Sequence, residues 1–92
     1  MKIKYFIPMK SYDDSSAAAP VVKNMGNDTA GLVVYDDRNK ALDDFDLDGY
    51  DIVECDSVTV RSHASAVHAA TGKLVKLFYN CEDLVDVDAI LL

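Results

Sequence analysis

The sequence has few cysteines and no long apolar run. Cys55 and Cys81 stand alone, without the CxxC or Cys/His spacing that a zinc site requires. We therefore expect two free, buried thiols and no zinc, because a disulfide would need an oxidising compartment. No run approaches the ~20 apolar residues of a membrane span. In the opening residues, MKIKYFIPM, Pro8 interrupts an apolar segment that is too short for a signal peptide. These absences predict a cytoplasmic protein that does not enter a membrane.

Motifs of catalysis and cofactor binding are also missing. The chain contains no P-loop, GxGxxG or HExxH motif. His63 and His68 are five residues apart, which places them on opposite faces of a strand or about 140° apart on a helix, so they form a poor metal pair. A nucleophilic Cys/His/Asp set has no local signature in this chain. We expect a protein that is not an enzyme and carries no cofactor.

Positive charge is scarce, and so is glutamate. Nine Lys and Arg residues face sixteen acids, fourteen of them Asp, and the formal charge is -7. Asp favours turns, loops and helix caps over the interiors of strands and helices, so most carboxylates should lie on connections. Such a protein repels free DNA, free RNA and anionic membranes, and it attracts basic protein surfaces.

The length of 92 residues, half of them apolar, is enough for one domain (residues 1–92) and too short for two cores. The apolar patterns predict an α+β fold: a mainly antiparallel β-sheet with one or two short helices packed on one face. In the first half we expect a strand over Lys2–Pro8, a helix over Ala17–Met25, a strand over Leu32–Tyr35, a turn at Asp36–Asn39 and a helical turn in ALDDF.

The second half fits more than one arrangement. The segment GYDIVECDSVTV predicts one long strand, or two strands broken near Asp56. In residues 61–80 the sequence favours a hairpin with Thr71-Gly72 at its turn, although the alanines of this segment also fit a helix. The last residues, EDLVDVDAILL, fit either an edge strand or a helix capped by Asn80.

The segment DDFDLDGYD can be compared with a calcium loop of the EF-hand type. Four residues match positions 1, 3, 5 and 6 of that loop: Asp44, Asp46, Asp48 and Gly49. Position 12 is Cys55 instead of a bidentate acid, and position 8 is Asp51 instead of an apolar residue. The residues before the loop predict a strand and a turn instead of an entering helix. A calcium-binding module is therefore an alternative interpretation only.

The same segment can also be an extended chain with a period of two. Phe45 and Leu47 would then face the core, and three carboxylates would share the opposite side: those of Asp44, Asp46 and Asp48. At about 3.3 Å per residue these carboxylates would lie roughly 6.6 Å apart, a spacing similar to that of successive phosphates in a nucleic acid. A basic groove that binds phosphates could accept them. Alternatively, they only keep a strand edge soluble.

Further acids and two tyrosines extend this segment into a predicted binding surface. Like charges at this density destabilise a fold unless a partner supplies cations, and tyrosine rings suit protein interfaces. The predicted partner-binding residues are Tyr35, Asp36, Asp37, Asp43, Asp44, Asp46, Asp48, Tyr50 and Asp51. A smaller basic face would permit contact with an RNA held by the partner, if the following lysines meet in the fold: Lys2, Lys4, Lys73 and Lys76.

In length, acidity and Asp-rich connections the chain resembles the small phage-encoded anti-CRISPR proteins, in particular inhibitors of the type I-F surveillance complex. The segments that carry the resemblance are VVYDDRNKALDDFDLDGYD and CEDLVDVD. The resemblance implies an α+β protein without enzymatic activity. It would act in the host-cell cytoplasm on a CRISPR surveillance complex of protein subunits and guide RNA, and block target DNA binding by steric and electrostatic occlusion.

Some members of this family mimic DNA and others wedge between subunits, and the sequence is compatible with both. A second class of protein would use the same charges on a different target. It comprises acidic immunity proteins and antitoxins, which cap a basic nuclease or toxin.

Overall fold

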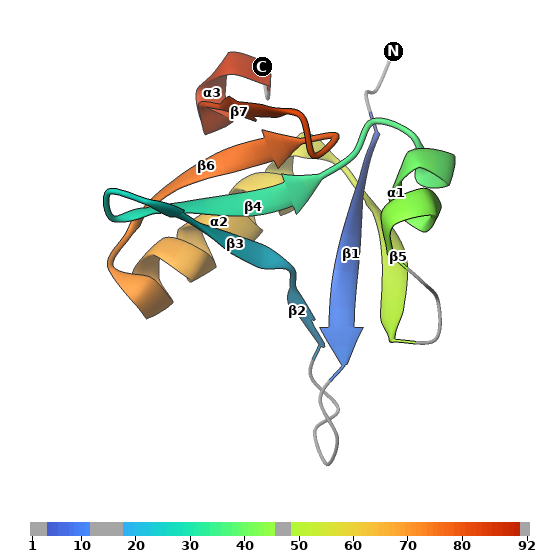
Figure 1. The fold of residues 1–92 in the computed structure, drawn as a ribbon, viewed down its shortest axis with the longest axis horizontal. Helices are drawn as coiled ribbons and strands as arrows, with labels where there is room; N and C mark the ends of the chain where they lie inside the picture. The colour runs from blue at the N-terminus through green and yellow to red at the C-terminus, as the bar shows by residue number, and fades with distance from the viewer. Residues whose placement is uncertain (1–3, 12–17, 46–48, 91–92) are drawn as a thin grey trace.

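The computed structural model describes residues 4–11, 18–45 and 49–90, whose strands form two sheets with three helices around them (Figure 1). The first sheet has the order β2-β1-β5 and consists of β1 (Tyr5–Ser11), β2 (Ala18–Pro20) and β5 (Tyr50–Cys55). The second has the order β3-β4-β6-β7 and consists of β3 (Val22–Gly26), β4 (Thr29–Val34), β6 (Leu74–Tyr79) and β7 (Asp83–Val85). The helices are α1 (Arg38–Asp44), α2 (Ser57–Thr71) and α3 (Val87–Ile90).

This architecture confirms the predicted α+β fold. All strand pairs are antiparallel except β4 with β6, which is parallel. Four details differ from the prediction. The strands divide between two sheets, and α2 is a full 15 residues long. The described residues contain three helices instead of one or two, and α1 and α2 pack on opposite faces of the first sheet. None of the helices in the described residues is long and apolar enough to cross a bilayer.

The two sheets are joined at Val21, the residue between β2 and β3. Its N–H donates to the carbonyl of Pro8 at 3.2 Å, and its own carbonyl accepts from the N–H of Val33 at 3.1 Å. A second link joins β1 to the end of β4, where Phe6 and Tyr35 exchange two backbone hydrogen bonds of 2.8 Å. Strand β1 therefore bonds to both sheets.

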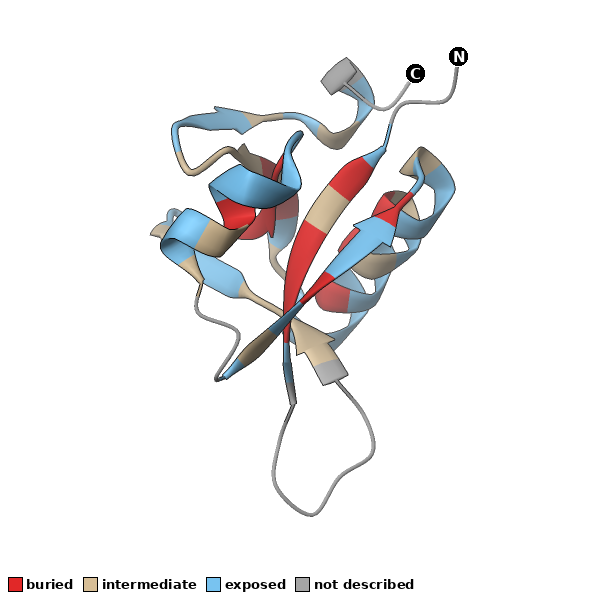
Figure 2. Ribbon diagram, turned by 90° about the vertical axis from the view of Figure 1, so that its right-hand side faces the viewer, coloured by how far each residue is buried: buried red, intermediate tan, exposed pale blue. Residues whose placement is uncertain are grey.

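The larger hydrophobic cluster lies between α2 and the strands. Alternate residues of β1 enter it, as the period of two predicts: Tyr5, Ile7 and Met9. Helix α2 contributes Val60, Ala64 and Val67, at the i, i+4, i+7 spacing of one helical face. In Figure 2 the buried residues follow the central strands and the inward sides of the helices, while the outward sides are exposed.

The predicted helix over Ala17–Met25 is wrong in the described part of that range, which forms β2 and β3. Pro20 has no N–H for a helix ladder, but it is tolerated at the end of a strand. The next turn contains Asn27 and Asp28, both with positive φ (52° and 58°). Two such residues form the tight turn that matches the twist of a hairpin, so β3 folds back on the buried strand β4.

The favoured hairpin at Thr71-Gly72 is also wrong, because residues 57–71 form α2. The carboxylate of Asp56 accepts the N–H of Thr59 at 2.9 Å and caps the helix start. Gly72 has φ 71° and donates its N–H to the carbonyl of His68, so this glycine ends a helix and does not turn a hairpin. The strand predicted before Asp56 is confirmed as β5, and the one after Gly72 as β6.

Smaller differences concern element ends. Strand β1 continues through Pro8 to Ser11, because the carbonyl of Pro8 still bonds while its missing N–H costs one ladder bond. Strand β4 starts at Thr29, ahead of the predicted Leu32. The predicted turn at 36–39 is shorter, since α1 already begins at Arg38. Near the C-terminus the edge strand β7 exists, but a short helix replaces its predicted continuation.

Candidate functional site

Five exposed aspartates lie on α1, on the two residues before it and on the neighbouring strand β5. These residues, called the acidic face below, are Asp36, Asp37, Asp43, Asp44 and Asp51. Helix α1 packs against β1 and β5, so the acidic face lies around the corner of the molecule that α1 and β5 form (Figure 1). The side chain of Asp51 leaves β5 on the side opposite to Ile52, which packs with Ala41 of α1. Two other predicted site residues, Asp46 and Asp48, lie outside the described residues.

The start of α1 is stabilised by the carboxylates of the two residues before it. Asp37 is the N-cap, and its Oδ1 accepts the N–H of Asn39 at 2.8 Å. Asp36 pairs with Lys40 one turn later, at 3.0 Å. The hydrogen bond from Lys40 is the main reason why the pKa of Asp36 lies below its usual value. These contacts fix two carboxylates in place and neutralise part of their charge.

The end of α1 is tied to the core by a buried tyrosine. The hydroxyl of Tyr35 lies 2.8 Å from Oδ2 of Asp44 and 2.9 Å from Sγ of Cys81. Since a carboxylate only accepts, the hydroxyl of Tyr35 donates its hydrogen bond to Asp44. The thiol of Cys81 then donates to the phenol oxygen. Burial, followed by these two hydrogen bonds, raises the pKa of Tyr35 far above its usual value. The phenol therefore stays protonated and keeps Asp44 in position.

The predicted role of Tyr35 as an exposed interface anchor is wrong, because its side chain is 0% exposed. Tyr50 is half-buried and remains accessible at the surface. Phe45 packs edge-on between them, with ring centroids 6.1 Å from Tyr35 and 5.0 Å from Tyr50. Phe45 thus faces the core as predicted, and its contacts with the two tyrosines anchor the end of α1.

We predict that Tyr35→Phe lowers the free energy of unfolding by about 1–2 kcal/mol, because Asp44 and Cys81 both lose a partner. Chemical denaturation measures the change. Tyr50→Phe is the matched control, since no hydrogen bond of its hydroxyl occurs among the described residues. An equal effect of both substitutions would contradict the network.

The predicted row of carboxylates along an extended chain is wrong for its first member. Asp44 is the last residue of α1, and Phe45 is the C-cap. The cap at Asp37 and the burial of Ala41 favour a helix here over the extended alternative. The rest of the predicted row, residues 46–48, lies outside the described residues.

The helix also corrects one argument about the calcium loop. An element that enters the loop is helical, contrary to the prediction, but the element that follows is the strand β5. In the part of the chain that the structure describes, no group of three or more His, Cys, Asp or Glu side chains is arranged to hold a metal ion.

The other candidate residues are dispersed. His63 is half-buried and His68 exposed on α2, where Nδ1 of His68 lies 2.7 Å from the carbonyl of Lys73. Both cysteines are free: Cys55 is buried, which raises the pKa of its thiol, and Cys81 is half-buried. The expectation of two free buried thiols thus holds for Cys55 and in part for Cys81.

The lysines do not form the predicted basic face in the described residues. Lys4 pairs with Glu54 at 3.2 Å on the first sheet, and Lys76 pairs with Asp86 at 3.4 Å on the second. Lys4 and Lys76 are thus each paired with a nearby acid, and Lys73 directly precedes β6 of the second sheet. Lys2 lies outside the described residues.

Sequence reasoning missed the loop after β6, which positions the acidic face. The N–H of Asn80 donates to the carbonyl of Val34 at 2.8 Å, and its Oδ1 accepts the N–H of Asp36 at 3.1 Å. Asn80 and Cys81 both have positive φ (56° and 55°). Asn is among the few residues that tolerate this conformation, so YNCE between two apolar segments was a usable signal for a tight turn.

Comparisons with known proteins add no identification. No family model, no curated protein and no solved structure matches the chain.

Proposed function

We propose that this protein is a non-catalytic inhibitor that docks its acidic face on a basic, nucleic-acid-binding surface of a larger assembly. The observation that carries the proposal is the acidic face itself, whose carboxylates sit on a capped helix and a paired strand. Asp43 and Asp51 are exposed and have no ion pair with any described residue. Their charges are available to cations of a partner.

Complementary charge sets both the strength and the speed of such an association. A single exposed ion pair contributes only about 0–1 kcal/mol, so affinity must come from several carboxylates acting together. Opposite charges on two surfaces also steer the encounter and exclude partners of the same sign. Tyr50, half-buried against Phe45 at the end of α1, offers an amphipathic ring at the rim of the same surface.

The partner that we propose is a CRISPR surveillance complex, with the type I-F complex as first candidate, and the outcome is a block of target DNA binding. Two features support this choice: the resemblance in size and Asp-rich segments to phage-encoded inhibitors, and the chemistry of the target. CRISPR effector complexes hold nucleic acid in positively charged channels. The acidic face could occupy such a channel in place of a phosphate backbone.

The test is a pull-down with the tagged full chain from a bacterial lysate that contains a type I-F system. We expect surveillance subunits to co-purify together with their guide RNA, and the captured complex to lose binding of a labelled target duplex. Recovery of a single basic nuclease or toxin would contradict the proposed partner and favour an immunity protein or antitoxin. Capture without any loss of DNA binding would contradict occlusion.

A further inference from the structure

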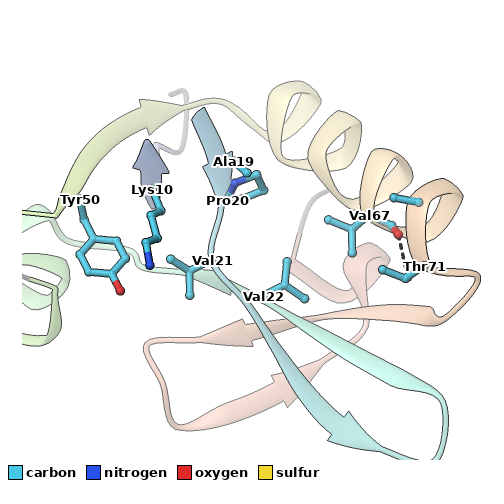
Figure 3. Close-up of a pocket in the computed structure, with 9 residues that line it drawn as sticks. Lys10, Ala19, Pro20, Val21, Val22, Tyr50, Val67 and Thr71 are labelled. Atoms are coloured by element: carbon cyan, nitrogen blue, oxygen red, sulfur yellow. Dashed lines mark hydrogen bonds between the residues drawn. The ribbon is translucent and has the colours of Figure 1, made fainter. Parts of the chain in front are cut away.

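A second surface feature is a groove that crosses the chain where β2 passes into β3 (Figure 3). Its volume is about 530 Å³, within the ~300–1,000 Å³ of small-molecule sites. Val21 and Val22 lie in its middle, between the first sheet on one side and the last turn of α2 on the other. Val22 is 36% exposed, which leaves apolar surface uncovered. The groove is therefore mainly apolar, and its polar side chains are those of Lys10, Tyr50 and Thr71.

One end of the groove carries two hydrogen-bond donors. Lys10 of β1 and Tyr50 of β5 are partners in the strand register, so their side chains leave the sheet on the same side. Figure 3 shows both side chains extending toward Val21. Within the described residues Lys10 forms no ion pair, in contrast to Lys4 and Lys40, which are paired with acids. An ammonium group and a phenol side by side favour an anion.

The opposite end of the groove disfavours an anion. It is formed by the last turn of α2, where the helix dipole carries partial negative charge. The hydroxyl of Thr71 is already used, since it donates to the carbonyl of Val67 at 2.7 Å. The remaining surface at this end is apolar, from Val67 and Ala70. A ligand is thus oriented, with its charged group near Lys10 and its apolar part toward α2.

We infer that this groove binds a small amphipathic carboxylate, an apolar body with one anionic head. The carboxylate would pair with the ammonium of Lys10 and accept from the hydroxyl of Tyr50, while the body covers Val21 and Val22. Asp51 does not interfere, because consecutive strand residues point to opposite faces and Asp51 is absent from the lining. The groove thus shares Tyr50 with the rim of the acidic face but contains none of its aspartates.

The first test uses decanoate, below its micelle concentration, as the probe of the full chain. Titration followed by amide NMR is expected to give saturable shifts at Lys10, Val22 and Ala70. Decylamine has the same chain and the opposite charge, and it should bind at least about tenfold more weakly. Equal binding of the two probes, or shifts confined to other elements, would overturn the inference. Tighter binding of a peptide through its C-terminal carboxylate would overturn the choice of a small ligand.

Substitutions test the contacts of the anionic head and of the apolar body separately. Lys10→Gln is expected to weaken decanoate binding at least about tenfold. Lys73→Gln is the matched control, because it removes one positive charge outside the groove and breaks no ion pair among the described residues; it should leave binding unchanged. Ala70→Phe, at an exposed position of α2, should fill the groove and abolish binding. Unchanged binding in Lys10→Gln would refute the anion site.

Discussion

Replacing all five aspartates of the acidic face by asparagine is expected to weaken partner binding by about two to three orders of magnitude. At about 0.7 kcal/mol per lost ion pair, within the ~0–1 kcal/mol of exposed pairs, five of them together give about 3–4 kcal/mol. The chain should stay folded, because asparagine caps α1 as well as Asp37 does. An asparagine at position 44 can also still accept the proton of Tyr35. Calorimetric titration with the purified partner measures the affinity.

The control for this variant removes the same kind of charge elsewhere. Asp28, in the β3–β4 turn, and Asp83, in β7, are exposed and have no ion pair among the described residues. Their double replacement by asparagine should change affinity less than about threefold. A matched pair on the acidic face, Asp43 and Asp51, should cost about tenfold. If both double variants lost the same affinity, total charge and not the acidic face would govern binding.

Leu77→Ala is expected to lower the free energy of unfolding by about 2–5 kcal/mol, a large part of the ~5–15 kcal/mol typical of small domains. Leu77 is 0% exposed in β6, where it pairs with Leu32 and Val85 on either side. Truncation leaves a cavity in the larger cluster, which neighbouring strands cannot fill without losing their register. Urea denaturation followed by circular dichroism measures the change.

The same strand provides the matched control. Leu74 is 58% exposed at the start of β6, so Leu74→Ala should cost less than about 1 kcal/mol. A loss of similar size in both variants would mean that Leu77 does not lie in the core that the strand pairing defines.

The sequence predicted those strands whose apolar residues alternate. Strand β1, with Tyr5 and Ile7 facing the core, shows a period of two that no helix shares. The α+β class followed from these patterns. The clustering of the acidic face was also predictable in part, because most of its aspartates are adjacent in sequence.

The errors arose where one residue has two possible roles. The sequence predicts a strand break near Asp56 and a hairpin turn at Gly72, but these residues cap the two ends of α2. Within Ser57–Val60 three residues are β-branched, which is typical of a strand, but the cap at Asp56 and the burial of Val60 favour the helix. The alanines before Pro20 favoured a helix until strand pairing with β1 decided otherwise.

The candidate site shows a further limit of sequence reasoning. Tyr35 and Tyr50 both lie next to aspartates in the sequence, which predicts the same role for them. In the structure Tyr35 is buried and donates to Asp44, whereas Tyr50 lines a groove. Their difference depends on contacts between residues far apart in the chain, such as Tyr35 with Cys81 and Tyr50 with Lys10.

The most direct test of the central claim, that binding depends on fixed negative charge, is the affinity of the native chain for its purified partner over a series of NaCl concentrations. Pairing of aspartates with cations predicts a steep, continuous loss of affinity as salt rises, with a shallower slope for the all-asparagine variant. Affinity that stays constant from low to high salt would contradict the claim.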